Sequence, residues 1–118
     1  MSSNIRAMIA DVEVEDLEAA IPLIPLYREL AGDVEVRRFP YRDLELASVG
    51  PFLLYSGPLD TYVSQTATVI VDSLDPVLKA LSNAGAEVLE GPDEVPNGTR
   101  ILARHPDGSA FEYLQPRT

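Results

Sequence analysis

Several residue types that carry chemistry are missing or scarce in this 118-residue chain. It contains no cysteine, and its single histidine is His105. The absence of cysteine excludes disulfides, thiolate nucleophiles and zinc–thiolate sites. One histidine excludes a two-histidine metal triad within one chain and leaves a Ser–His–acid triad barely feasible. The commonest covalent and metal-dependent mechanisms therefore have few residues to use.

Positive charge is also scarce. Nine Lys and Arg residues against nineteen Asp and Glu residues give a formal net charge of −10. Nucleic acids and anionic membrane surfaces both attract basic surfaces, so neither is an expected partner. A neutral or cationic partner is compatible with this charge, although acidity by itself mainly favours solubility.

Long hydrophobic runs are absent as well. The longest apolar stretch, residues 19–27, is interrupted by Pro22 and Pro25 and is far shorter than the roughly 20 residues that span a bilayer. The first sixteen residues lack the basic end and apolar run of a signal peptide. We therefore expect a cytoplasmic protein. The length predicts a single domain over residues 1–118 with a real core.

The apolar pattern predicts a β-α-β-β-β unit that occurs twice, in modules of about residues 4–57 and 63–116. In the first module we expect a helix from Leu17 to Ala31, with Asp16 as its N-cap, and strands at residues 5–14, 33–39, 44–49 and 52–55. In the second we expect a helix at 74–84, closed by Gly85, and strands at residues 65–71, 87–90, 100–104 and 110–114. Pro22 and Pro25, in a tandem Ile-Pro-Leu sequence, should kink or split the first helix.

The fold class expected from this pattern is α+β. Two tandem βαβββ modules should form curved mixed sheets around a cleft, with the helices on the outer faces. Residues 14–18 can be aligned with residues 71–75, which favours an internal duplication. Each module then needs the other because it leaves one sheet face uncovered.

This layout resembles the vicinal oxygen chelate superfamily, which includes glyoxalase I, bleomycin-resistance proteins and extradiol dioxygenases. The second half carries the clearest sequence pieces, at residues 71–75, 83–88, 91–92, 96–100 and 105–113. The first half adds residues 15–20, 27–32 and 49–54. The resemblance covers nearly the whole chain and indicates the fold rather than an activity, since the superfamily includes lyases, isomerases, dioxygenases and plain binders. It also implies a homodimer.

Metal-using members of the superfamily place one ligand on the first strand and one on the last strand of each module. By resemblance, these positions fall on Ile9, Leu53, Thr66 and Glu112. Only Glu112 has a side chain of the usual ligating kind, whereas a divalent cation needs several N or O donors. We therefore expect that the metal site has been lost and that no cofactor is bound.

The residues expected to contact a ligand are Ile9, Asp11, Arg38, Leu53, Thr66, Thr68 and Glu112. Glu112 is also the one catalytic candidate, and its alternative role is an ion pair with Arg38 or Arg100. Thr66 and Thr68 share one strand face and would line the cleft, or are ordinary strand threonines. Asp11 would give the cleft a negative lining, or is a solvated strand-end acid.

Three further sets of residues each have two possible roles. Arg37 and Arg38 are adjacent, so one of them points to each side of its strand, either toward a ligand or into solvent. His105 precedes the turn Pro106-Asp107-Gly108; it either has a metal or catalytic role or, as we expect, is a solvated or turn-stabilising residue. Tyr55 and Tyr62 either stack on a planar ligand or pack within the protein.

We expect a metal-independent binding protein that is similar to the drug-sequestering members of the superfamily. Its ligand would be a small apolar or aromatic organic molecule, cationic ones included. An enzyme is the second hypothesis, either a glyoxalase-like lyase or isomerase with a divergent or inter-subunit metal site or a metal-free acid–base catalyst using Glu112. A non-catalytic dimerising or regulatory module is the third. One carboxylate without a nearby histidine is a small set for catalysis, which favours binding.

Overall fold

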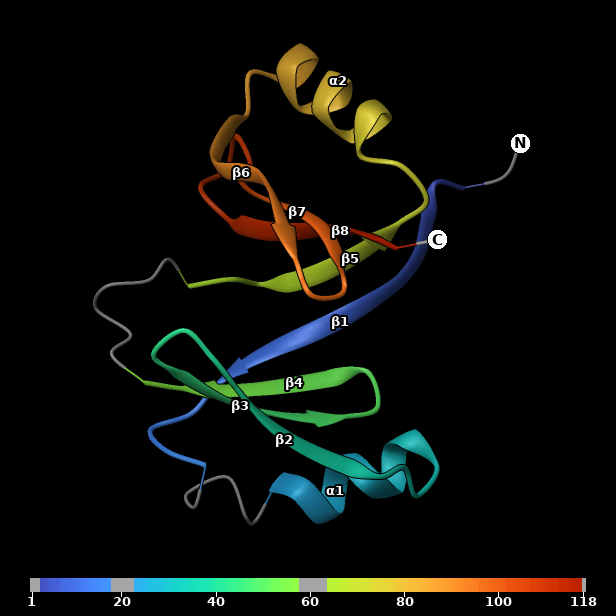
Figure 1. Ribbon diagram of the computed structural model, residues 1–118, viewed down its shortest axis with the longest axis vertical. Helices are drawn as coiled ribbons and strands as arrows, with labels where there is room; N and C mark the ends of the chain where they lie inside the picture. Colours follow the sequence, from blue (N-terminus) through green and yellow to red (C-terminus); the bar gives the residue numbers. More distant parts are fainter. Residues whose placement is uncertain (1–2, 18–22, 58–63, 118) are drawn as a thin grey trace. The chain divides into compact units, whose positions relative to one another are not determined.

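A computed structural model describes residues 3–17, 23–57 and 64–117 of the chain. Figure 1 shows the element order, which is β-α-β-β-β repeated once. The first module contains β1 (Ile5–Glu13), α1 (Leu23–Ala31), β2 (Val36–Tyr41), β3 (Leu44–Val49) and β4 (Phe52–Ser56). The second contains β5 (Ala67–Val71), α2 (Leu74–Ala84), β6 (Glu87–Val95), β7 (Gly98–Arg104) and β8 (Ala110–Pro116). The predicted α+β class and the double βαβββ order are confirmed.

The two modules have the same strand topology. In the first, β1 pairs with β4 in parallel, and the β4–β3 and β3–β2 pairs are antiparallel. In the second, β5 pairs with β8 in parallel, and the β8–β7 and β7–β6 pairs are antiparallel. Each helix therefore connects the first strand of its module to the strand farthest from it. This repeated topology is what an internal duplication would leave, and the sheets are mixed as expected.

The described residues form two compact units that do not coincide with the two modules. Unit 1 contains the residues up to Ile9 together with those from Gln65 onward, and unit 2 contains Ala10–Ser64. Hydrogen bonds explain why the start of β1 belongs to unit 1. The Asn4 side chain donates to the carbonyl oxygen of Ser73 (2.9 Å) and accepts from the Ser73 N–H (3.1 Å). The Arg6–Asp72 ion pair adds a further link at 2.9 Å.

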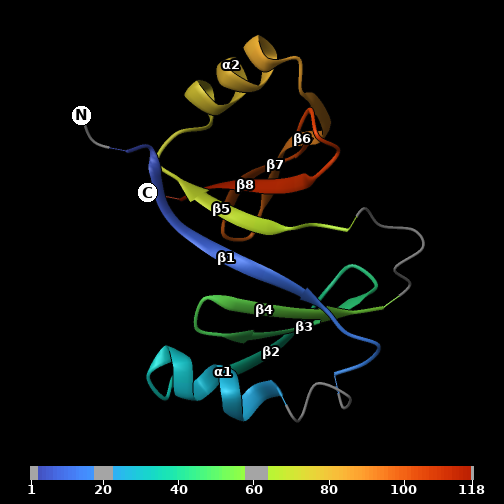
Figure 2. The same ribbon diagram turned by 180° about the vertical axis from the view of Figure 1, so that it is seen from behind.

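Unit 1 is built by packing α2 on one face of its sheet, as Figure 2 shows. The core contains Val69, Val71, Ile101 and Ala103 from the strands and Leu74 and Leu81 from the helix. The helix begins after Ser73, whose hydroxyl accepts from the Asp75 N–H, and ends at Gly85, whose φ is 76°. Such a left-handed residue suits glycine. The predicted bounds of α2 and the helix-facing side of β5 are therefore confirmed.

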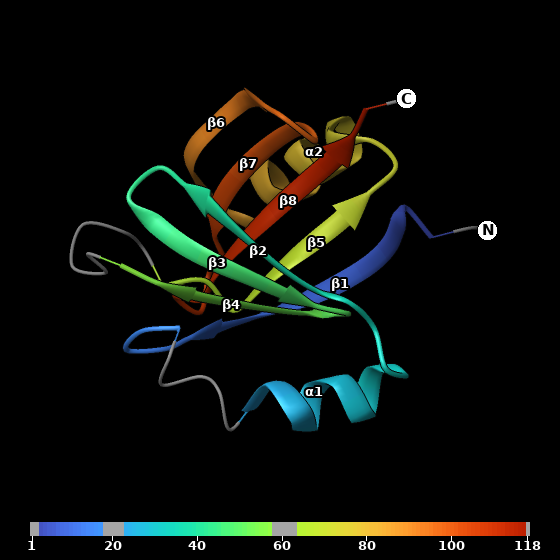
Figure 3. The ribbon, with the colours of Figure 1, turned by 60° about the horizontal axis from the view of Figure 1, so that its bottom comes forward.

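Unit 2 places α1 against its own sheet, as Figure 3 shows. Its buried core contains Leu17, Ala47, Val49 and Leu54, and the ring of Tyr27 stacks on that of Phe52 with 4.0 Å between centroids. Within residues 3–17, 23–57 and 64–117, no helix is long and apolar enough to cross a membrane.

The expected interruption of the first helix at Pro25 is wrong. The helix begins at Leu23, which places Pro25 in its first turn. The missing N–H of a proline costs little there, because first-turn N–H groups have no partner inside the helix. Residues 18–22, which include Pro22 and most of the expected first turn after Asp16, lie outside the described part of the chain.

Strand ends also differ from the predictions. β2 starts at Val36 rather than at residue 33, because Gly32 and Asp33 have φ angles of 89° and 62° and turn the chain first. β6 continues to Val95 and β7 begins at Gly98, so that the two strands form one long hairpin around a two-residue turn.

Candidate functional site

The sheet of unit 1 has a second face, opposite α2, on which two of the predicted ligand residues lie together. In the strand register Thr68 faces Glu112, and Glu112 faces Leu102 on the following strand. Arg100 faces Leu114 in the same way. Residues that face each other in adjacent strands project to the same side. We call this surface the second face of unit 1.

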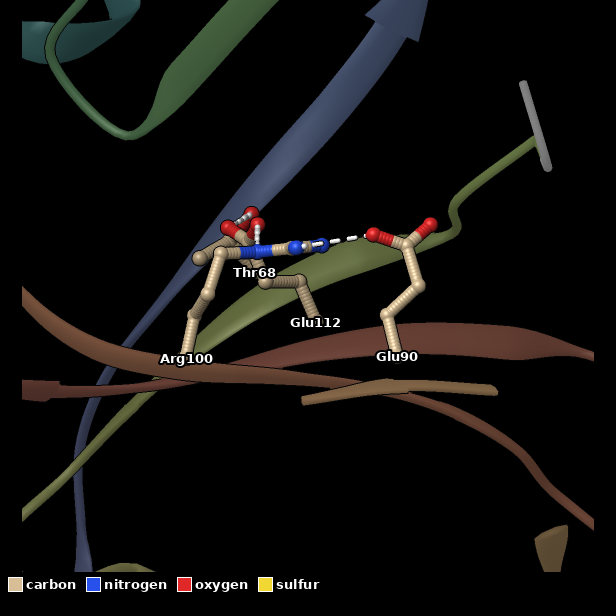
Figure 4. A network of polar contacts seen from close by, with 4 residues as sticks. All are labelled: Thr68, Glu90, Arg100 and Glu112. Carbon is tan, nitrogen blue, oxygen red and sulfur yellow. Dashed lines mark hydrogen bonds and ion pairs between the residues drawn. The ribbon is translucent and has the colours of Figure 1, made fainter. Parts of the chain in front are cut away.

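Four polar side chains on this face form one hydrogen-bonded network, shown in Figure 4. The Thr68 hydroxyl donates to Glu112 Oε1 at 3.1 Å. Arg100 donates from Nε to Glu112 Oε2 at 2.7 Å and from Nη1 to Glu90 Oε1 at 3.1 Å. One guanidinium is thus held between two carboxylates, and the four residues come from four neighbouring strands.

Local backbone geometry explains how these side chains meet. Arg100 and Glu112 are diagonal neighbours across the β7–β8 pair, because Glu112 faces Leu102 and Arg100 faces Leu114. Long side chains can reach such a diagonal partner. On the other side, β6 has register shifts both before and after Glu90. A bulged strand aims a side chain away from its regular direction, and here Glu90 contacts Arg100 although Asp93 is the residue that faces Arg100 in the register.

The network is largely shielded from water. The Arg100 side chain is 5% exposed, compared with 20% for Glu112 and 36% for Glu90. Charged side chains with so little exposure to water are tolerated when they are paired and hydrogen-bonded. Within the described part of the chain, no buried side-chain N or O atom lacks a hydrogen-bond partner. Of the two arginines considered for Glu112, the structure pairs it with Arg100.

Unit 2 also has a second face, opposite α1, and it carries two other predicted residues, Asp11 and Leu53. Asp11 faces Leu53, Leu53 faces Ser48, and Ser48 faces Arg37. Ile9, the other predicted residue of β1, belongs to unit 1 and is not counted with this face. We call this surface the second face of unit 2.

The structure does not bring Arg38 to that face. Arg38 faces Ala47, which is buried in the core that α1 covers, and its Nη2 lies 3.9 Å from Glu45 Oε2. Arg38 lines a hollow of about 490 Å³ on that side of the sheet, with Glu15, Asp16, Leu17, Glu45, Ser56 and Gly57. Its neighbour Arg37 is the arginine that shares a face with Asp11 and Leu53.

The remaining residues have simpler surroundings. Thr66 is exposed and precedes β5, and its N–H donates to the carbonyl oxygen of Ala110 at 2.9 Å. Tyr55 lies on the second face of unit 2, where it faces Leu46. Tyr62 lies outside the described residues.

Glu90 is the one member of the unit 1 network that sequence reasoning missed. The adjoining Gly91-Pro92, which interrupts a regular strand, was the only local signal for the bulge that positions it.

The comparisons with known proteins come from solved structures alone, because no protein-family model and no curated protein matches the sequence. A crystal structure of an uncharacterized protein from Methanosarcina mazei is 34% identical, covers 98% of this chain and 95% of its own, and superimposes with a TM-score of 0.78. Methylmalonyl-CoA epimerase from Mycobacterium tuberculosis is 17% identical over 100% of this chain and 93% of its own, with a TM-score of 0.65.

The Mn(II)-bound glyoxalase from Novosphingobium aromaticivorans is 15% identical, with a TM-score of 0.58. This chain matches it over 96% of its own length and 40% of the glyoxalase. The chain belongs to one family with the Methanosarcina mazei protein and has the vicinal oxygen chelate fold. The resemblance inferred from the sequence is thereby confirmed at the level of the fold.

The four residues that the resemblance assigns to metal-ligand positions do not fit a divalent cation. Ile9 and Leu53 have no donor atoms, and Thr66 offers a single neutral hydroxyl. Glu112 already accepts hydrogen bonds from Arg100 and Thr68. No group of three or more His, Cys, Asp or Glu side chains suited to a metal occurs within residues 3–17, 23–57 and 64–117. We therefore derive no chemistry through a metal.

His105 lies on the other side of the unit 1 sheet, away from this network. Its Nε2 is 2.6 Å from the Tyr113 hydroxyl, and its ring stacks on Phe111 with 4.4 Å between centroids. Both aromatic residues pack against the α2 core. The His105 backbone also closes the following turn, since its N–H donates to Ser109 and its carbonyl oxygen accepts from Gly108. His105 therefore contacts its turn, as expected, and also packs against two aromatic side chains of β8.

A high-pH stability measurement tests this packing. Burial raises the pKa of the Tyr113 phenol above its ordinary value. The folded state thus keeps a neutral phenol at pH values where the unfolded chain ionises it, so stability is full below about pH 10 and falls as the pH rises further. We expect the free energy of unfolding to fall more steeply above about pH 10 for the wild type than for Tyr113→Phe. Urea denaturation across this range measures the difference, and parallel curves would contradict the assignment.

Proposed function

We propose that this protein is a metal-independent binding protein with the vicinal oxygen chelate fold. Its ligand is a small apolar or aromatic molecule, and this class includes aromatic molecules that carry a positive charge. The observation that carries the proposal is the state of Glu112, the one carboxylate at the four metal-ligand positions. A guanidinium of the same chain already balances its charge at 2.7 Å. A carboxylate that is already balanced in this way supports a function that needs only affinity.

The second face of unit 2 supports the proposed class of ligand. Phe39 faces Leu46, Leu46 faces Tyr55, and Tyr55 faces Glu13. Phe39 is 42% exposed, so part of an aromatic residue on this face is accessible to a ligand. The Tyr55 ring next to Glu13, with Phe39 and Asp11 on the same face, favours a planar organic cation through stacking and charge attraction. The net charge of −10 also favours a cationic ligand.

The magnitude of the hydrophobic effect is sufficient for useful affinity. Burial of about 300 Å² of apolar ligand surface at roughly 25 cal/mol per Å² contributes several kcal/mol before association costs are subtracted. Micromolar affinity is therefore within reach without a metal–ligand bond. A lyase or isomerase, in contrast, needs groups that polarise or deprotonate a substrate, and Glu112 is held by two internal donors.

Metal content and ligand binding test the proposal together. Protein purified without chelator is expected to contain far less than one metal ion per chain, and EDTA should leave its melting temperature unchanged. Titration with the fluorescent aromatic cations acriflavine and ethidium is expected to show saturable binding that raises the melting temperature. Stoichiometric metal, or no binding by these cations and by neutral aromatic compounds such as naphthol, would contradict the proposal.

A matched pair of variants locates the site. Asp11→Asn removes a negative charge from the second face of unit 2, whereas Glu29→Gln removes an exposed charge from α1. We expect Asp11→Asn to weaken the binding of the aromatic cation about three- to tenfold and to leave naphthol binding unchanged. Glu29→Gln should change neither.

A further inference from the structure

Arg100 places a positive charge next to the carboxylate that the fold family would offer to a metal. Its Nε lies 2.7 Å from Glu112 Oε2, which is the short distance typical of a charge-assisted hydrogen bond. The same guanidinium reaches Glu90 Oε1 at 3.1 Å. The Arg100 side chain is the most buried of the three, at 5% exposure.

Two partly buried carboxylates on one sheet face require a neighbouring cation. Without one, each would bear the cost of leaving water and would repel the other. A divalent metal and a guanidinium both meet this requirement, but they differ in one respect. Arginine stays protonated at every physiological pH and cannot be removed by a chelator. Its planar donor groups also fix the directions of both carboxylates, as a coordinating metal would.

We propose that Arg100 is a built-in cation that takes the place of the metal of the fold family beside Glu112. This inference deepens the proposed metal-independent function and rests on it. The groups that accept hydrogen bonds from the guanidinium are the carboxylates of Glu90 and Glu112, and the Thr68 hydroxyl donates to Glu112. Oxygen donors of this kind suit hard divalent cations such as Mn²⁺. Removal of the guanidinium should therefore create an affinity for Mn²⁺ that the wild type lacks.

The test compares Arg100→Met with the wild type and with a control in the same unit, Arg117→Met. Arg117 forms an exposed ion pair with Glu94 at 3.3 Å, so its removal changes the net charge equally without touching the network. Melting temperatures are measured in EDTA and in rising MnCl₂ concentrations, and Mn²⁺ binding is measured by electron paramagnetic resonance. We expect Arg100→Met to melt below the wild type in EDTA and to recover saturably with one Mn²⁺ per chain. The wild type and Arg117→Met should not respond.

A second substitution assigns the response to Glu112. Addition of Glu112→Gln to Arg100→Met should remove the Mn²⁺ response. If Arg100→Met is unfolded in EDTA, recovery of its circular dichroism spectrum in MnCl₂ is the supporting result, and Arg100→Gln repeats the measurement with a polar side chain. Absence of an Mn²⁺ response in both variants, folded or unfolded, overturns this inference. It would leave the proposed function untouched, because that depends on metal content and ligand binding of the wild type.

Discussion

Gly98→Ala is expected to lower the free energy of unfolding by about 4 kcal/mol or more. Gly98 begins β7 with a φ of +151°, a backbone conformation that residues with a Cβ rarely adopt. A Cβ at this position would collide with the carbonyl oxygen of Gln115 and would lie 2.9 Å from the Cα of Pro116. Both neighbours are backbone atoms of β8, so only separation of the two strands relieves the clash.

The control for Gly98→Ala is Gly108→Ala. Gly108 also has a positive φ, of +97°, but a Cβ added to it would have no heavy atom within 4 Å beyond its chain neighbours. This control therefore carries the backbone strain without the clash, and we expect it to cost about 1 kcal/mol. Urea denaturation of both variants measures the difference. If Gly98→Ala lowers the free energy of unfolding no more than Gly108→Ala does, β7 and β8 can separate at this point at little cost, which would contradict the prediction.

The β7–β8 pairing matters because the same two strands carry Arg100 and Glu112. The second large effect concerns this pair. Arg100→Met and Glu112→Met are each expected to cost about 3 kcal/mol, because each leaves a shielded charge without its main partner. The double variant should cost less than the sum of the two, since it removes both charges together. Urea denaturation of the four proteins gives the coupling energy of the pair.

A second cycle on Arg117 and Glu94 provides the comparison. These side chains are 59% and 69% exposed, so water screens their interaction. Their coupling should stay at or below about 1 kcal/mol. If the Arg100–Glu112 coupling is equally small, the network does not hold the sheet face together. A Glu112 that only contacted a ligand would also lose little stability on substitution, so the cycle separates a structural carboxylate from a free binding group.

The elements that could be predicted from the sequence are those with strong local signals. The bounds of α2 follow from its apolar spacing and from Gly85, and both signals act within the helix itself. β3 was predicted with its observed bounds for a similar reason, since Gly50-Pro51 separates it from β4. Val69 and Val71 were assigned to the helix-facing side of β5 by simple alternation, and the packing confirms this.

The candidate site was less accessible to such reasoning. Alternation shows that Arg37 and Arg38 point to opposite sides, but not which of them shares a face with Asp11. A shift of one residue in the strand pairing exchanges the two faces, and no local signal in β2 decides it. Glu90 was missed because a regular strand would not aim it at Arg100, and the bulge around it depends on pairing with β7.

The sequence by itself determined the order of the elements, the duplicated pattern, and the small number of residues that could bind a metal, with no cysteine and one histidine. These properties follow from residue identity and from contacts between near neighbours along the chain. Only the tertiary structure decided that the partner of Glu112 is Arg100, that Glu90 completes the network, and that Arg38 lies on the α1 side of its sheet instead of beside Asp11. Each of these depends on strand register, which is set by the packing of whole faces between residues distant in sequence.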